Sequence, residues 1–357
     1  MEVVARELIP ELRRVNPRLE LTAFVNREAA EAAEGPWLDE IPHVVVPVHA
    51  RRRVEWVRGE QQLLPRLARR HGIEVLHSLA STAPGWGAFR RVVTIHDLIY
   101  RIHPEAHAGV LTLGMRVLVG LAARRSHRVI TDSRSTRDDL VRLLSVPPDR
   151  IDVVPLGVRA LDRGAPTPER LLRSRYELGD RPIVLSVSAR RPHKNLLRLL
   201  DAVNAIPPDE RPMMVVPGYP TWHERELRSR AAELGLQGDV RFVSWVPDAD
   251  LEGLYQASRC FVFPSLYEGF GLPVLEAMQR GLPVACSDRA SLPEIAGDAA
   301  LLFDPENTTA ITAAIGRLLS DDELCLRLAA AGRRRAAGFT WERTARETLA
   351  AYERAVA

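Results

Sequence analysis

The sequence predicts an α/β fold made of two doubly wound domains in series. Short apolar runs rich in β-branched residues alternate with longer stretches of helical periodicity along the whole chain. A length of 357 residues favours two domains over one. A polar, proline-bearing stretch over 155–180 indicates a linker, so we expect domains over 1–175 and 176–339, followed by a last helix over 340–357.

Each domain follows from its own alternation of elements. In the first domain, residues 2–15 are expected to form a helix, and Ser133 or Ser135 should cap another. The remaining strands there are expected at 19–26, 44–48, 73–77, 92–95, 129–131 and 151–154, and helices at 53–70, 110–125 and 135–144. In the second domain we expect strands at 183–187, 213–216, 240–243, 260–263 and 284–286, and helices at 195–205, 223–234, 248–257, 273–280, 309–319 and 322–337. Thr340 should cap the last helix. Because ligands bind at the carboxyl ends of parallel strands, two such domains facing each other should enclose a binding cleft.

The most informative stretch is FVFPSLYEGFGLPVLEAMQRG, residues 261–281. It predicts a buried strand, a loop with two glycines and a helix with proline in its first turn. Free N–H groups and the helix dipole make such a junction an anion site, and we expect the backbone of Gly269, Phe270, Gly271 and Leu272 to contact a ligand. Glu268 and Glu276 frame the loop, as would suit a phosphate with hydroxyl-bearing rings on both sides. The alternative is a plain strand–helix unit with a helix-capping acid.

Lysine occurs once in this chain. Of 49 basic residues, only Lys194 is not arginine, and it follows the strand over 183–187. Because every other basic residue is arginine, this single lysine indicates a site that needs a compact ammonium.

The stretch around Glu268 and Glu276 resembles, almost word for word, the E-x7-E signature of retaining glycosyltransferases of family four. The resemblance covers nearly the whole chain, and TWERTARETLAAYERAV resembles the helix that crosses back to the first domain in that family. It implies the GT-B fold, with two Rossmann-like domains facing across a cleft. It also implies a mannosyltransferase-like enzyme that transfers a hexose from GDP-mannose, or alternatively UDP-glucose, to a glycan or lipid-linked acceptor in polysaccharide synthesis.

The same resemblance assigns roles to single residues. Glu268 would bind the donor sugar and Glu276 the ribose, while Lys194 and Arg190 would clamp the diphosphate, with Arg191 as the alternative to Arg190. His96 would contact the donor sugar or the acceptor. Asp97 would orient nearby groups. From their places in the chain, Ser265 and Glu294 are further candidates near the nucleotide, and Gly218, after the strand over 213–216, would let the donor approach closely.

No metal or other cofactor is expected. No His, Asp or Glu cluster has ligand spacing, and Asp248-Ala249-Asp250 indicates helix capping. The basic residues and the helix end would replace Mg²⁺. Retention leaves two routes open, attack on the face that the leaving group vacates or a covalent intermediate on Glu268.

Charge and composition limit the kinds of partner that this chain can have. Residues 1–175 hold 28 Arg against 21 Asp and Glu, a net +7, and residues 176–357 hold 21 basic against 25 acidic residues, a net −4. The basic half suggests peripheral contact with a membrane surface or a lipid phosphate, although a solvated arginine face is the alternative. Arginines without interleaved aromatics argue against nucleic acid. Three cysteines without metal or redox spacing, and no apolar run long enough to span a membrane, indicate a cytoplasmic protein.

One departure from the resembled family concerns the start of the chain. The family usually opens with a strand and a glycine-rich loop, whereas here residue 1 directly precedes the first helix. We therefore expect the first strand of the N-terminal sheet to be missing. This leaves a nucleotide-sugar-binding protein without turnover as the alternative to an enzyme.

Overall fold

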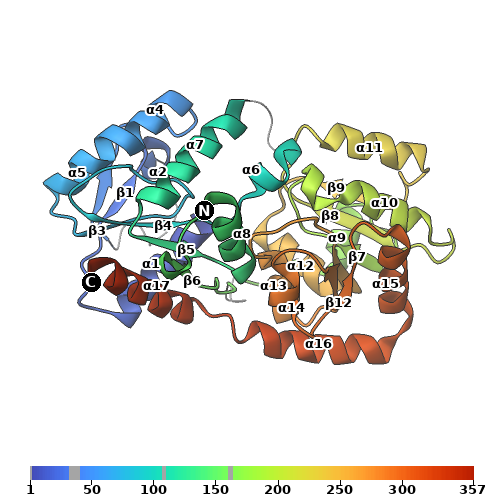
Figure 1. The fold of residues 1–357 in the computed structure, drawn as a ribbon. Coiled ribbons are helices and arrows are strands. Elements are labelled where there is room, and N and C mark those ends of the chain that lie inside the picture. Colours follow the sequence, from blue (N-terminus) through green and yellow to red (C-terminus); the bar gives the residue numbers. More distant parts are fainter. Residues whose placement is uncertain (1, 32–40, 107–109, 160–163) are drawn as a thin grey trace. The chain divides into compact units, whose positions relative to one another are not determined.

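The computed structural model describes residues 2–31, 41–106, 110–159 and 164–357 (Figure 1). The chain divides into two compact units. Unit 1 comprises Met1–Ile102, His107–Gly157 and Thr340–Ala357, and unit 2 comprises His103–Ala106 and Val158–Phe339. The division after Gly157 differs from the predicted boundary at 175/176.

Packing of α9 explains where the boundary falls. This helix, Glu169–Arg175, packs on α12, Asp248–Ala257, inside unit 2. The carboxylate of Asp250 accepts hydrogen bonds from Thr167 Oγ1 at 2.6 Å and from the Arg175 guanidinium at 2.5 Å. Asp250 is buried and therefore ties the segment after the boundary to unit 2, a different role from the helix capping that we expected.

Unit 1 contains two parallel sheets. Four strands pair in the order β3-β4-β5-β6, and β1 pairs with β2 separately. The strands are β1 (Ala23–Val25), β2 (His43–Val45), β3 (Val75–Ser78), β4 (Arg90–Thr94), β5 (Arg128–Thr131) and β6 (Ile151–Val153). The helices are α1 (Glu2–Val15), α2 (Arg27–Glu31), α4 (Arg53–Arg58), α5 (Leu64–Arg70), α6 (Ile99–Ile102), α7 (Val110–Arg125), α8 (Arg134–Leu144) and α17 (Trp341–Val356).

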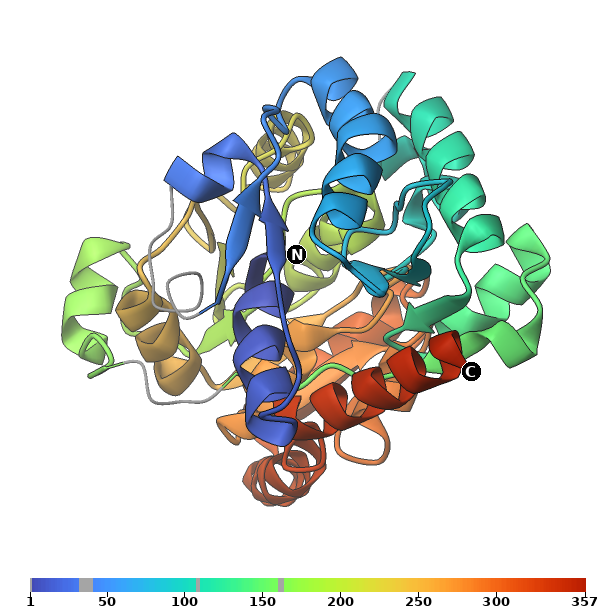
Figure 2. The same cartoon turned by 90° about the vertical axis from the view of Figure 1, so that its left-hand side faces the viewer.

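Alternating side chains cover both faces of the four-stranded sheet. Val92 and Ile130 pack against Ala351 and Ala355 of α17, whereas neighbouring strand residues pack under α7 and α8. Helix α17 also lies against α1 in both views (Figures 1 and 2). The last helix of the chain is thus part of the unit 1 core.

Unit 2 holds one six-stranded parallel sheet in the order β12-β11-β10-β7-β8-β9. Its strands are β7 (Ile183–Leu185), β8 (Met213–Pro217), β9 (Val240–Val243), β10 (Cys260–Phe263), β11 (Val284–Ser287) and β12 (Leu301–Phe303). Its other helices are α10 (Leu196–Asn204), α11 (Glu224–Glu233), α13 (Leu272–Gln279), α14 (Leu292–Ala296), α15 (Thr308–Ser320) and α16 (Asp322–Ala336). The chain runs outward from β7 to β9 and then returns to β10, so the order reverses between β7 and β10. Ligands of doubly wound sheets bind at such a reversal.

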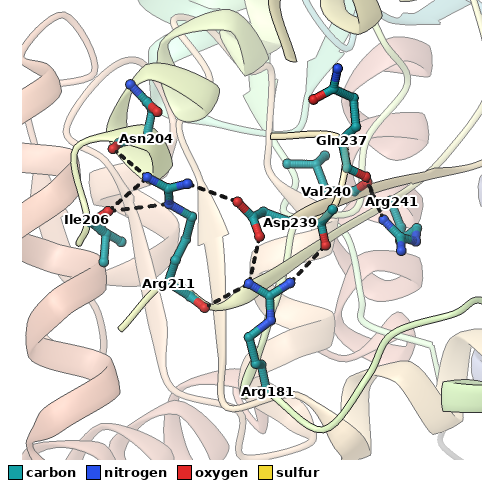
Figure 3. Close-up of polar contacts among 9 residues, drawn as sticks. Arg181, Asn204, Ile206, Arg211, Gln237, Asp239, Val240 and Arg241 are labelled. Carbon is teal, nitrogen blue, oxygen red and sulfur yellow. Dashed lines mark hydrogen bonds and ion pairs between the residues drawn. The ribbon is translucent and has the colours of Figure 1, made fainter. Parts of the chain in front are cut away.

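The amino-terminal edge of this sheet is tied by a polar network (Figure 3). The carboxylate of Asp239 bridges two guanidinium groups, with Arg181 Nη1 at 2.6 Å and Arg211 Nη1 at 2.9 Å. Arg211 also donates to the carbonyl oxygens of Asn204 and Ile206. Because ligands bind at the opposite edge, this network supports the scaffold.

Most of the predicted elements are present. Ser133 and Thr340 cap α8 and α17 through their hydroxyl groups, which confirms both predicted caps. The helix expected over 53–70 is interrupted by a π-helical turn, Gly59–Leu63. Among the described α-helices and strands, the short elements α2, α6, α9, α14 and β12 had no prediction. None of the helices in the described ranges combines the length and apolarity needed to cross a bilayer.

Candidate functional site

The two strands at the reversal are joined by an ion pair. Lys194 ends a short 3₁₀ helix, Pro192–Lys194, after β7, and Glu268 lies in the loop after β10. Lys194 Nζ donates to Glu268 Oε1 at 2.6 Å, and both side chains are largely buried, with 15% and 10% exposed. The ammonium also lies 5.2 Å from the centre of the Phe263 ring. The chain's single lysine is therefore held at the ligand-binding edge of the sheet.

The glycine loop that carries Glu268 is fastened from α14. Ser291 Oγ contacts the carbonyl oxygens of Glu268 at 3.0 Å and of Phe270 at 2.6 Å. Gly271 adopts a φ of 116°, and a Cβ there would lie 2.8 Å from Leu292 Cδ2, so only glycine suits this position. Sequence reasoning missed Ser291, although its place just before a proline-led helix was a usable signal.

Helix α13 begins directly after this loop, as the stretch 261–281 predicted. Its first residue is Leu272, and proline occupies its first turn. The first N–H groups of a helix have no partner within the helix, and the helix dipole makes that end positive. Gly269, Phe270 and Gly271 are buried around this helix start. The junction can therefore bind an anionic group beside Lys194.

Glu276 is oriented by a tyrosine. Tyr255 Oη donates to Glu276 Oε2 at 3.1 Å, and burial together with the charge of Glu276 raises the pKa of Tyr255. Arg280 lies 4.6 Å from the Tyr255 ring centre and donates to the carbonyl oxygen of Glu276. The phenol thus remains a hydrogen-bond donor and fixes the carboxylate on α13.

The structure corrects the role expected for Arg190. Its side chain is fully buried, and its guanidinium contacts Glu224 Oε2 at 2.6 Å and the carbonyl oxygens of Val216 and Val243. Partial burial opposes ionisation of Glu224, but hydrogen bonds from Arg228 and Arg190 lower its pKa. Arg190 therefore ties together the segments around β8, β9 and α11, and its guanidinium is occupied by these internal partners.

Arg191 is the better placed of the two arginines. It is half-buried, and within the described part of the chain its guanidinium forms no hydrogen bond or ion pair. It lies three residues before Lys194 on the same loop after β7. Arg191 can therefore turn toward a ligand without breaking an internal contact.

Gly218 lies in close contact with the loop after β7. A Cβ at this position would lie 1.9 Å from the carbonyl oxygen of Ser188. The glycine thus allows the loop after β8 to pass against the loop after β7, and that space is filled by protein backbone. Its lack of a side chain therefore permits close packing between two loops, and its predicted contact with a donor stays a prediction.

Three buried serines lie where β7 and β10 end. The hydroxyl groups of Ser186, Ser188 and Ser265 find no partner among the described residues. Buried hydroxyls are nearly always paired with protein or water, so these three mark an edge where polar partners are expected. Ser265 lies two residues after the end of β10, which agrees with its predicted position near the ligand edge.

Glu294 and His103 also belong to unit 2. Glu294 is half-buried on α14, where its carbonyl oxygen accepts a hydrogen bond from Arg335 at 2.5 Å. The segment His103–Ala106 groups with unit 2, and the His103 ring centre lies 6.2 Å from that of Tyr267. Sequence reasoning gave no role to His103.

In unit 1, His96 follows β4 as predicted. Its Nδ1 lies 2.5 Å from Asp132 Oδ2, and its Nε2 lies 3.0 Å from the carbonyl oxygen of Leu79. Asp97 Oδ1 accepts a hydrogen bond at 3.0 Å from the backbone N–H of Ile99, the first residue of α6. Among the described residues, no group of three His, Cys, Asp or Glu side chains has a geometry that could hold a metal ion.

Comparison with known proteins identifies the family. Residues 1–160 match Glycosyltransferase Family 4, and residues 169–335 match Glycosyl transferases group 1. The O-antigen chain mannosyltransferase B of Escherichia coli is 35% identical over 268 residues, which are 74% of this chain and 70% of that protein. The chain belongs to the group 1 glycosyltransferases.

Solved structures place this glycosyltransferase in the GT-B fold. Sucrose-phosphate synthase from Thermosynechococcus elongatus superposes with a TM-score of 0.78 at 22% identity, covering 98% of this chain and 92% of the synthase. Anabaena HepE, solved in complex with UDP-glucose, gives 0.73 at 19% identity, covering 97% and 95%. The glycosyltransferase thus has two Rossmann-like units, as the sequence predicted.

Proposed function

We propose that this glycosyltransferase transfers a mannosyl group from GDP-mannose to a glycan or lipid-linked acceptor with retention of configuration. The family membership supports sugar transfer, and the similarity to an O-antigen chain mannosyltransferase supports mannose. The observation that carries the proposal is the Lys194–Glu268 pair beside the start of α13.

The pair suits a ligand that contains both a diphosphate and a sugar. The leaving diphosphate gains negative charge as the glycosidic bond breaks, and preorganised positive groups stabilise that charge. Lys194 supplies an ammonium, Arg191 supplies a guanidinium, and the start of α13 supplies the N–H of Leu272 and the positive end of the helix dipole. When Lys194 Nζ moves from Glu268 to the diphosphate, the Glu268 carboxylate becomes available to accept hydrogen bonds from sugar hydroxyls.

Glu276 would hold the other end of the donor. Its carboxylate, already oriented by Tyr255, can accept hydrogen bonds from both ribose hydroxyls. The two acids lie on opposite sides of the glycine loop in sequence, as a donor with rings on both sides of a diphosphate requires.

The proposed mechanism uses no metal and no covalent intermediate. Attack comes from the face that the diphosphate leaves, and a diphosphate oxygen takes the acceptor's proton. We prefer this route because, among the described residues, no second acid is paired with Glu268 as in retaining hydrolases. Full activity in excess EDTA, and an α-linked first product seen by proton NMR from an α-linked donor, would support it. A β-linked first product would overturn retention.

A thermal-shift panel tests the donor. GDP-mannose should raise the melting temperature of the wild-type protein more than UDP-glucose or ADP-glucose does, because only a ligand that binds the folded state stabilises it. Release of GDP in the presence of acceptor should then follow the same order. A larger shift and faster turnover with UDP-glucose would replace mannose by glucose, an alternative favoured by the UDP-glucose complex of HepE.

The acceptor is tested separately from the donor. A soluble oligosaccharide and a lipid-linked saccharide are compared at fixed GDP-mannose, with hydrolysis of the donor as the background. Donor stabilisation without product on either acceptor class, and without hydrolysis, would contradict enzymatic turnover.

A further inference from the structure

His96 lies between two oxygen atoms. Nδ1 lies 2.5 Å from Asp132 Oδ2, and Nε2 lies 3.0 Å from the carbonyl oxygen of Leu79. Asp132 follows β5 and has a side chain only 3% exposed, so its carboxylate is nearly withdrawn from water. The hydroxyl of Thr136 donates to the carbonyl oxygen of His96 and so holds the backbone of this residue in place.

This arrangement determines where the ring carries its protons. A backbone carbonyl oxygen can only accept a hydrogen bond, so Nε2 must carry a hydrogen. A carboxylate at 2.5 Å is likewise an acceptor for Nδ1–H, and its other oxygen, Oδ1, has no partner among the described residues. A ring that donates from both nitrogens is an imidazolium.

A second histidine, His77, is neutral. His77 on β3 lies between the Tyr352 hydroxyl at 2.8 Å and Thr94 Oγ1 at 2.7 Å, with no carboxylate beside it. Burial, with a smaller effect from the charge of His96, lowers the pKa of His77 to about 3. Burial also opposes charge on His96, but the charge and hydrogen bond of Asp132 outweigh it and raise the pKa of His96 above the ordinary 6.5.

We infer that Asp132 is a positioning residue that holds His96 as a charged ring donating from both nitrogens, so that His96 acts as a hydrogen-bond donor and not as a proton acceptor. The inference rests on the proposed function for its catalytic part. His96 offers Nε2–H to a donor or acceptor oxygen in exchange for Leu79, while Asp132 keeps Nδ1 occupied. Loss of the proton from His96 therefore reduces transfer.

The charged and titratable groups facing His96 from the described elements are few. Asp132 approaches from the end of β5, and His77 from β3, with Tyr352 of α17 behind it. Asp97 is adjacent in sequence, and its Oδ1 accepts a hydrogen bond from the backbone N–H of Ile99. Of these, only Asp132 contacts the imidazole, so its charge should dominate the proton affinity of the ring.

The experiment compares wild type, Asp132→Asn and Asp132→Glu by nitrogen NMR of labelled histidine rings, with His96→Gln to assign the signal. In wild type, His96 should stay doubly protonated to higher pH than an ordinary histidine. In Asp132→Asn its titration should move down by about 1–3 pH units, the effect expected on removing an opposite charge at this distance. Asp132→Glu should restore part of the shift, which separates charge from loss of folding.

The same variants are assayed for sugar transfer. The alkaline limb of the kcat/KM profile should move down with the ring titration in Asp132→Asn. Asp152→Asn is the matched control, because Asp152 is another buried carboxylate of the same sheet and binds Arg128 at 2.6 Å. Its loss should lower stability and leave the alkaline limb where it is.

The outcomes are distinguishable. A neutral His96 ring at neutral pH in wild type, or an unchanged titration in Asp132→Asn, would overturn the charge state. A shifted ring with an unshifted kcat/KM profile would overturn the role in transfer. Absence of transfer from every donor in wild type would overturn the proposed function and the catalytic part of this inference, while the NMR titration would still decide the state of the ring.

Discussion

Lys194 Nζ lies 2.6 Å from Glu268 Oε1, and this contact joins the loops after β7 and β10 where the strand order of unit 2 reverses. Each residue neutralises the other in a largely buried setting. The pair should therefore keep unit 2 stable without ligand, and we propose that it presents an ammonium and a carboxylate to a sugar nucleotide.

Removing either partner should reduce stability, because the other charge is left buried and unpaired. We expect Lys194→Ala and Glu268→Gln each to cost on the order of 1–3 kcal/mol, and the double variant less than their sum. Urea unfolding of the four proteins measures this coupling. Additive losses would mean that Lys194 and Glu268 do not stabilise the folded state through their contact with each other.

The two single variants should differ in their effect on the donor. Lys194→Ala removes the proposed diphosphate contact, so donor affinity should fall by about tenfold or more. Glu268→Gln should preserve much of the affinity for free GDP while reducing the gain from the attached mannose. Calorimetric titration with GDP and with GDP-mannose separates the two effects. Equal losses for both ligands in both variants would contradict the assignment.

Arg190 and Arg191 should respond in opposite ways to substitution. Arg190→Met leaves Glu224 short of a buried partner and should cost about 3 kcal/mol, which corresponds to a fall of about 10 °C in Tm. Arg191→Ala should leave Tm within about 1 °C and weaken donor binding about tenfold. Differential scanning fluorimetry with and without GDP-mannose gives both readouts. A stable Arg190→Met protein with weakened donor binding would restore the clamp role that the sequence suggested.

Gly218 should tolerate no side chain, for packing reasons alone. Gly218→Ala would force a methyl group against the Ser188 carbonyl oxygen and should cost about 3 kcal/mol. Gly316→Ala is the matched control, since a Cβ there meets nothing within 4 Å inside α15 and should stabilise the protein by about 0.5–1 kcal/mol. Thermal unfolding of both variants measures these two changes in stability. A stable Gly218→Ala protein that fails to bind donor would return Gly218 to the ligand site.

His77 should make unit 1 less stable as the pH falls. The unfolded ring takes up a proton below about pH 6.5, whereas the folded ring stays neutral to about pH 3 because it is buried. Stability is therefore complete above that window and decreases within it, by at most about 1.4 kcal/mol per pH unit. His96 has a raised pKa, so its contribution is complete below about pH 6.5 and is lost only as the pH rises above that value.

Urea unfolding at about pH 7.5 and about pH 5.5 measures the effect of His77, with His77→Gln as the comparison. The wild-type protein should lose more stability over this interval than the variant does. Subtracting the loss of stability of the variant from that of the wild type removes the contribution of carboxylates, which titrate alike in both proteins. Identical losses would show that His77 is already accessible to protons in the folded state.

Much of the fold followed from the sequence because its determinants are local. Strand and helix periodicity, the Ser133 and Thr340 caps and the proline-led start of α13 depend on residues a few positions apart. Short elements such as α9 and β12 escaped prediction because they are stabilised by packing on distant segments, as the contacts of Asp250 with Arg175 show.

The candidate site likewise has one part that the sequence predicted and one part that it did not. The sequence by itself determined that Lys194, Glu268 and Glu276 follow strands at the ligand-binding edge, since a strand, a glycine loop and a helix start are encoded by neighbouring residues. Only the tertiary structure decided that Arg190 is buried against Glu224, that Gly218 packs on Ser188, and that Asp132 binds His96. Those partners lie about 30 residues apart in the chain, and no local pattern specifies which side chains the folded sheet brings together.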